Sequence, residues 1–153
     1  MNASTNTTLQ ITREIGAPRD RAYAAWTDTE LAKQWWGPKD VQTEELVIKP
    51  RVGGKFRWQL RTPEGEGITA EGEFREVRPV EKLALTWRGT QDVVDGAEES
   101  VVSVEFREKD ARTTELILTH ENLPSEESRD NHAEGWNSAL DKLERFVARG
   151  TIK

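Results

Sequence analysis

Few side chains in this sequence could carry out chemistry. Its 153 residues include no Cys and two His, so a thiolate nucleophile, a disulfide framework and a cysteine zinc site are excluded. His120 ends a segment of alternating apolar residues, and His132 lies one turn before Trp136 in a segment with helical spacing. If the two His meet, they could transfer protons or bind a metal, but no third ligand stands at a recognisable spacing. No metal and no other cofactor are therefore expected.

Other motifs of catalysis or cofactor binding fail on their context. The stretch from Gly65 to Ala70 resembles a dinucleotide-binding loop, but it lies in a predicted hairpin turn and no helix follows it. His120-Glu121 lacks the second His of a metalloprotease, because Pro124 occupies that position. No Ser lies in a nucleophile elbow. The sequence therefore offers no catalytic residue and does not predict an enzyme.

Arg13 is a charged residue on a face that should be buried. Leu9, Ile11 and Ile15 alternate with polar residues, as in a strand with one buried face, and Arg13 falls on the apolar side. A buried Arg is rarely left unpaired. Its partner is therefore either a carboxylate such as Glu76 or the polar group of a ligand.

Tryptophan is abundant, whereas the aliphatic residues are scarce. The chain has six Trp, and Leu, Ile, Val and Phe together account for 32 of its 153 residues, or 21%. Each indole can bury about 150–250 Å². Trp58, Trp87 and Trp136 fall on inward faces of predicted elements, and Trp26, Trp35 and Trp36 lie in two short predicted helices. The indoles are either ordinary core residues or the walls of a cavity.

The elements that position these residues follow from hydrophobic periodicity. A strand is predicted near residues 9–15, followed by two short helices, one opening at Ala17-Pro18 and one over 30–36. From 41 to 122 the period becomes two, which predicts an antiparallel meander of about six strands. Ser125 then caps a long helix whose apolar stripe includes Ala133, Trp136, Leu140, Leu143 and Val147. We therefore predict an α+β fold in which a curved antiparallel sheet of about seven strands wraps around a long C-terminal helix.

Glycine marks places where this architecture needs space. Gly53, Gly54 and Gly72 predict bulges or a close approach of two backbones. Gly135 lies inside the last helix, where glycine costs about 1 kcal/mol relative to Ala. It allows either tight packing of helix on sheet or room for a ligand beside Trp136 in a gap between the two.

Charge and hydropathy exclude several classes of partner. The formal net charge is −6 and the signs are interspersed, which argues against nucleic acid and anionic membrane surfaces. No apolar run reaches the roughly 18 residues of a membrane span, and the polar N-terminus lacks the features of a signal peptide. We expect a flexible tail over 1–7, a single domain over 8–150, and a cytoplasmic monomer or weak homodimer without membrane insertion.

An ordered set of short motifs resembles a known family. Ala17-Pro18-Arg19, Ala25-Trp26-Thr27-Asp28, Trp35-Trp36-Gly37-Pro38, Pro50-Arg51-Val52-Gly53-Gly54, Glu76-Val77-Arg78-Pro79, Thr119-His120-Glu121 and Gly135-Trp136 occur in this order. Together they are similar to the AHSA-type proteins, homologues of an activator of the heat-shock protein 90 ATPase, in the START-related (SRPBCC) helix-grip superfamily. The resemblance runs from residue 8 to about 148. It implies a helix-grip fold around an apolar cavity, and it carries over no universal catalytic motif.

The residues and the resemblance together predict a binding protein. We expect a small hydrophobic or aromatic ligand, such as a lipid, a polyketide or a similar natural product, between the sheet and the last helix, with Arg13 and His120 orienting its polar end. The residues expected to line this site are Arg13, Trp26, Trp35, Trp36, Phe56, Trp58, Phe74, Leu85, Trp87, Val104, Leu118, His120, His132, Gly135, Trp136 and Leu140. The resemblance also implies two alternatives: a co-chaperone-like protein-interaction domain, and a self-resistance protein that sequesters a reactive enediyne-type natural product.

Overall fold

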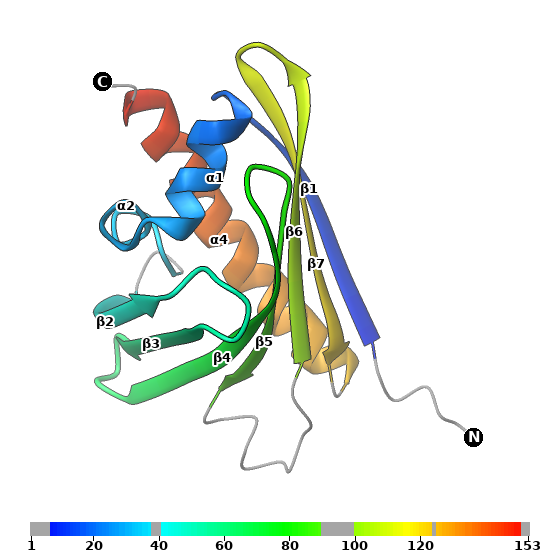
Figure 1. Ribbon diagram of the computed structural model, residues 1–153. Helices are drawn as coiled ribbons and strands as arrows, with labels where there is room; N and C mark the ends of the chain where they lie inside the picture. Colours follow the sequence, from blue (N-terminus) through cyan, green and yellow to red (C-terminus); the bar gives the residue numbers. More distant parts are fainter. Residues whose placement is uncertain (1–6, 38–40, 90–99, 124, 151–153) are drawn as a thin grey trace.

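A computed structural model describes residues 7–37, 41–89, 100–123 and 125–150. They form an open antiparallel sheet of seven strands in the order β1-β7-β6-β5-β4-β3-β2, which curves around one long helix (Figure 1). The strands are β1 (Thr7–Ile15), β2 (Gln42–Ile48), β3 (Lys55–Arg61), β4 (Gly67–Arg78), β5 (Lys82–Gly89), β6 (Ser100–Asp110) and β7 (Thr113–Leu123). The helices are α1 (Arg19–Thr27), α2 (Thr29–Ala32) and α4 (Glu126–Gly150). The predicted α+β fold is confirmed.

Two of the predicted segments lie largely outside the residues that the structure describes. Of the predicted tail over 1–7, only Thr7 is described, and β1 begins there. The stretch over 89–99 is rich in acidic residues and Gly, which predicts a loop between two strands, and it lies outside the described residues apart from Gly89, which ends β5.

The long helix α4 forms where capping and the apolar stripe predict it. The Ser125 hydroxyl accepts a hydrogen bond from the Ser128 backbone N–H at 3.1 Å, which satisfies one of the donors that a helix start leaves free. Trp136, Leu140, Leu143 and Val147 are buried, and Ala133 is partly buried. Because these residues share one face of the helix, α4 buries a single stripe against the concave side of the sheet.

The second short helix is shorter than predicted. Asp28 caps α2 by accepting hydrogen bonds from the backbone N–H groups of Glu30 and Leu31 at 2.9 and 3.3 Å, but the helix ends at Ala32 instead of continuing to Trp36. The Trp35 backbone N–H donates to Ala32 three residues back, at 3.1 Å, which tightens the chain into turns. These turns allow two consecutive indoles, Trp35 and Trp36, both to be buried.

Helix α4 lies over one half of the sheet. Its contacts are with β1, with β7 and with α1, and α1 in turn contacts β6 and β7. Figure 1 shows α1 and α2 on the same side of the sheet as α4. The inner faces of β3, β4 and β5 are therefore covered by side chains and not by the backbone of the long helix. None of the described helices combines the length and the apolar character needed to cross a membrane.

Arg13 joins β1 to α4 instead of facing Glu76. Its guanidinium forms ion pairs with Asp141 at 3.0 Å and with Glu144 at 2.6 Å, and it donates a hydrogen bond to the Asn137 side chain at 3.0 Å. Of the two alternatives for Arg13, the structure shows pairing with carboxylates, but these belong to Asp141 and Glu144 and not to Glu76. Strand β4, which carries Glu76, lies far across the sheet from the edge strand β1.

The position of Gly72 in β4 shows why glycine is needed there. A Cβ at this residue would lie 1.7 Å from the carbonyl oxygen of Thr86 in β5, so the backbones approach too closely for any side chain. A break in the register follows between Phe74 and Glu76, where the alternation of apolar residues also changes. The predicted close approach and bulge are both present in this strand.

Replacement of this glycine tests the close approach. Gly72→Ala should lower the free energy of unfolding by about 2–3 kcal/mol, because β4 and β5 must separate to admit the methyl group. Gly16→Ala is a matched control, since a Cβ at Gly16 would meet nothing within 4 Å. Urea unfolding of both variants measures the difference, and equal stabilities would contradict the predicted clash.

Candidate functional site

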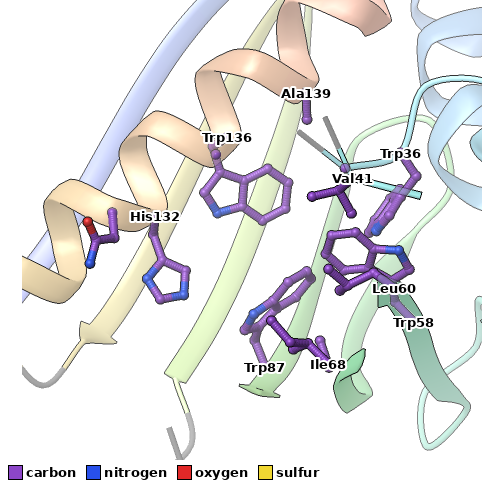
Figure 2. Close-up of a pocket in the computed structure, with 13 residues that line it drawn as sticks. Trp36, Val41, Trp58, Leu60, Ile68, Trp87, His132, Trp136 and Ala139 are labelled. Atoms are coloured by element: carbon purple, nitrogen blue, oxygen red, sulfur yellow. The ribbon is translucent and has the colours of Figure 1, made fainter. Parts of the chain in front are cut away.

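A cavity of about 230 Å³ lies between α4 and the inner faces of β3, β4 and β5. Figure 2 shows its walls, with Trp136 and His132 extending from the helix and Trp58, Leu60 and Ile68 from the strands. Asn131 is exposed and also lines the cavity, so the cavity is open to solvent at that end. The lining residues are Trp36, Gly37, Val41, Trp58, Leu60, Ile68, Ala70, Trp87, Asn131, His132, Gly135, Trp136 and Ala139.

Four indoles supply most of the aromatic surface of the cavity. Trp36 is the common neighbour: its ring centre lies 6.2 Å from that of Trp58, 6.5 Å from Trp87 and 6.4 Å from Trp136. The rings meet at angles from nearly parallel to nearly perpendicular, so the cavity presents both ring faces and ring edges. Aromatic guests bind well to such a mixture, because they prefer offset-stacked and edge-to-face contacts.

Local backbone geometry holds Trp58 in this arrangement. Gly37 adopts a φ of +90°, and a Cβ there would lie 2.7 Å from Cζ2 of Trp58, so both the conformation and the space require glycine. The Trp58 indole N–H also donates to the Thr43 hydroxyl at 3.0 Å. The ring is thus fixed by a neighbouring backbone and by a hydrogen bond.

Trp26 and Trp35 form a second layer behind the cavity wall. Trp26 stacks on Trp136 with the ring centres 6.1 Å apart, and Trp35 meets Trp26 edge to face at 4.9 Å. The Trp35 N–H donates to the Ala25 carbonyl at 3.0 Å, whereas the buried Trp26 N–H has no partner among the described residues. These two indoles support the wall from α1 and from the turns after α2.

His120 connects two of the lining indoles through a chain of buried hydrogen bonds. Its Nδ1 accepts from the Trp136 indole N–H at 3.1 Å. Because an indole N–H can only donate, the proton of the neutral imidazole lies on Nε2, which is 2.7 Å from the Ser100 hydroxyl. Ser100 in turn donates to the Trp87 carbonyl at 2.8 Å. Every polar group in this series of hydrogen bonds has a partner when His120 is neutral.

The charged form of His120 is strongly disfavoured. Burial, together with the neighbouring His132, lowers its pKa from the ordinary 6.5 to about 3. A second proton on Nδ1 would also face the Trp136 N–H and break that hydrogen bond. His120 therefore stays neutral near neutral pH, so the structure favours a positioning role over proton transfer.

His132 is the member of the pair that lines the cavity. The two imidazoles meet edge to face with their centres 4.9 Å apart, a contact that the sequence alone leaves open. Nδ1 of His132 lies 2.8 Å from the Ser128 carbonyl, one turn earlier in α4. No cluster of three or more potential metal ligands exists among the described residues.

Comparison with known proteins identifies the family. The sequence matches the family model described as Activator of Hsp90 ATPase homolog 1-like protein over residues 16–148. The chain belongs to this family. No curated protein matches it. The family match confirms the AHSA-type resemblance, and the strand order around α4 is that of the expected helix-grip fold.

Solved structures agree with this assignment. The chain is similar to a protein from Chromobacterium violaceum, with a TM-score of 0.81, 22% identity and coverage of 92% of this chain and 96% of that one. It is also similar to the AHSA1 protein of Silicibacter pomeroyi, with a TM-score of 0.81, 24% identity and coverage of 94% and 99%. CalU16 from Micromonospora echinospora has a TM-score of 0.68 and 23% identity, with coverage of 95% and 78%. At these identities the likeness shows the fold alone.

The structure divides the predicted site residues of this AHSA1-type chain into two groups. Those on the cavity wall are Trp36, Trp58, Trp87, His132, Gly135 and Trp136. Those away from the wall are Arg13, Trp26, Trp35, Phe56, Phe74, Leu85, Val104, Leu118, His120 and Leu140. The others of the second group are buried in the interior, and Arg13 lies at the contact between β1 and α4.

Several lining residues are absent from the sequence prediction. Leu60, Ile68 and Ala70 share the inward faces of β3 and β4, so their alternation with polar residues is the signal that could have identified them. Ala139 lies three residues after Trp136 on the helix stripe and could be found in the same way. Asn131 gives no such signal, because it is an exposed polar residue. Gly37 and Val41 complete the set.

The depressed pKa of His120 predicts a dependence of stability on pH. Below about pH 6.5 the unfolded chain binds a proton at His120, whereas the folded chain does not until about pH 3. The stability that this residue contributes is therefore complete above pH 6.5 and is lost as the pH falls toward 3, with a limiting slope of about 1.4 kcal/mol per pH unit.

Substitution of His120 separates this effect from the titration of carboxylates. His120→Asn keeps an acceptor near the Trp136 N–H but does not titrate, so its stability should fall less steeply between pH 6.5 and pH 4. Urea unfolding of both proteins at several pH values gives the two slopes. Parallel slopes would show that His120 is not the buried neutral group that the structure describes.

Proposed function

We propose that this AHSA1-type protein binds a small, mainly aromatic molecule in the cavity between α4 and the sheet. The observation that supports the proposal is the cavity itself, a space of about 230 Å³ walled by four indoles and by small aliphatic side chains. A pocket that is largely apolar, with a few polar groups at one end, is the common form of a small-molecule site. The family assignment is consistent with this function.

The volume of the cavity limits the size of the enclosed part of the ligand. An engineered cavity of about 150 Å³ binds benzene, whereas sites for drug-sized molecules begin at about 300 Å³. The cavity of about 230 Å³ lies between these values. It suits a unit of about two fused rings, and a larger natural product would extend through the open end beside Asn131.

Filling the cavity tests the proposal with naphthalene as the probe. Ala139→Phe places a ring where a methyl group now lines the cavity, so naphthalene should bind at least about tenfold more weakly in equilibrium dialysis. Ala111→Phe adds the same ring at an exposed turn between β6 and β7 and should bind as the unchanged protein does. No binding of naphthalene by the unchanged protein would overturn the proposal.

A second variant that fills the cavity distinguishes a loss of the site from a folding defect. Ile68→Phe enlarges the opposite wall, on β4, and should also weaken the binding of naphthalene. Thermal melting of each variant shows whether it is folded. Two folded variants that both retain full affinity would place naphthalene outside the cavity.

Mass spectrometry and an ATPase assay distinguish the other functions that the resemblance implies. Native mass spectrometry of the freshly purified protein should show a non-covalent ligand that is released on denaturation. A covalent adduct or a cleaved chain after exposure to an enediyne would instead favour self-resistance. Stimulation of a cognate chaperone ATPase that Ala139→Phe leaves unchanged would favour a co-chaperone-like role.

A further inference from the structure

The lining of the cavity is chemically uneven. Among its described lining residues, the side chains that carry an amide or an imidazole are Asn131 and His132, neighbours on α4. Figure 2 shows His132 on one side of the cavity and Val41, Leu60 and Trp58 on the other. The donors of two lining indoles are already used, by Thr43 for Trp58 and by His120 for Trp136. The amide of Asn131 and the imidazole of His132 therefore give the cavity a polar end at α4.

The hydrogen bond of His132 determines what that end can recognise. Nδ1 lies 2.8 Å from the carbonyl oxygen of Ser128, and a carbonyl oxygen only accepts, so Nδ1 carries the proton of the neutral imidazole. Nε2 is then an acceptor, and it makes no hydrogen bond to another residue in the described part of the chain. The ring of His120 packs against this imidazole at 4.9 Å and limits its rotation.

We propose that the ligand is a flat aromatic molecule of about two rings that carries a hydroxyl at one end, and that this hydroxyl donates a hydrogen bond to Nε2 of His132. This inference rests on the proposed binding function and specifies its ligand class. The four indoles and the aliphatic side chains would contact the rings, and His132 would select the orientation in which the hydroxyl points toward α4.

Two other ligand classes suit the site less well. A carboxylate would bring an acceptor to the acceptor Nε2, so the two lone pairs would repel each other. A quaternary ammonium often binds among aromatic rings, but no carboxylate is present among the described lining residues to balance its charge. A neutral hydroxyl donor matches both the apolar walls and the acceptor.

Equilibrium dialysis of matched naphthalenes measures this preference. 2-Naphthol should bind about five- to tenfold more tightly than 2-methoxynaphthalene, which has the same rings but no donor. The methoxy compound is the more apolar of the two, so a cavity without a suitable acceptor would bind it at least as well. Equal affinities, or tighter binding of 2-methoxynaphthalene or of 2-naphthoate, would overturn the inference.

Variants assign the preference to one atom. His132→Phe removes the acceptor and should abolish the advantage, so that the variant binds 2-naphthol no more tightly than 2-methoxynaphthalene. His132→Gln retains an acceptor oxygen and should keep part of the advantage. Glu134→Gln, at an exposed position of α4 outside the cavity lining, is the neighbouring control and should keep all of it. Loss of the advantage in Asn131→Ala, where His132 remains, or persistence of the advantage in a folded His132→Phe, would show that His132 is not the acceptor.

These outcomes separate the two proposals. If naphthalene binds but the hydroxyl gives no advantage, the binding function stands and the inference about His132 is wrong. If none of the naphthalenes binds, the proposed function itself is overturned. The comparison of ligands on the unchanged protein does not depend on the folding of any variant.

Discussion

A single helix cannot cover a seven-stranded sheet, and the rest of the structure depends on this mismatch. Strands about 4.8 Å apart give a sheet roughly 29 Å wide, whereas a helix with its side chains is about 10–12 Å across. Helix α4 is in contact with β1 and β7, so the inner faces of β3, β4 and β5 need another cover. Large side chains supply this cover, and a cavity remains in the place where these side chains do not meet one another.

The choice of tryptophan follows from this geometry. An indole reaches farther from its backbone than Leu or Ile, and one indole can contact several others across the gap, as Trp36 does. A buried indole N–H usually takes a hydrogen-bond partner, and His120, which is itself held by Ser100, provides one for Trp136. The polar residues behind the wall thus fix the orientation of the aromatic residues within it, which a purely aliphatic core would not require.

Sequence patterns predict the elements of this fold better than they predict the site. The alternation over 41–122 and the helical stripe give the sheet and α4, because both periods reflect which face is buried. Leu85 and Leu60 have the same inward pattern, yet only Leu60 lines the cavity. The difference depends on where α4 crosses the sheet, a tertiary property that periodicity does not contain. The partner of Arg13 is missed for the same reason, since Glu144 lies 131 residues away in the chain.

The position of α4 over one side of the sheet has a consequence for adaptation. The ion pairs that join α4 to β1, between Arg13 and both Asp141 and Glu144, use residues that do not line the cavity. The side chains of β3 and β4 that do line it, such as Leu60, Ile68 and Ala70, are not part of these ion pairs. A lineage of such proteins can therefore change the shape of its binding site by substitutions on these strands while the frame that carries the helix stays constant.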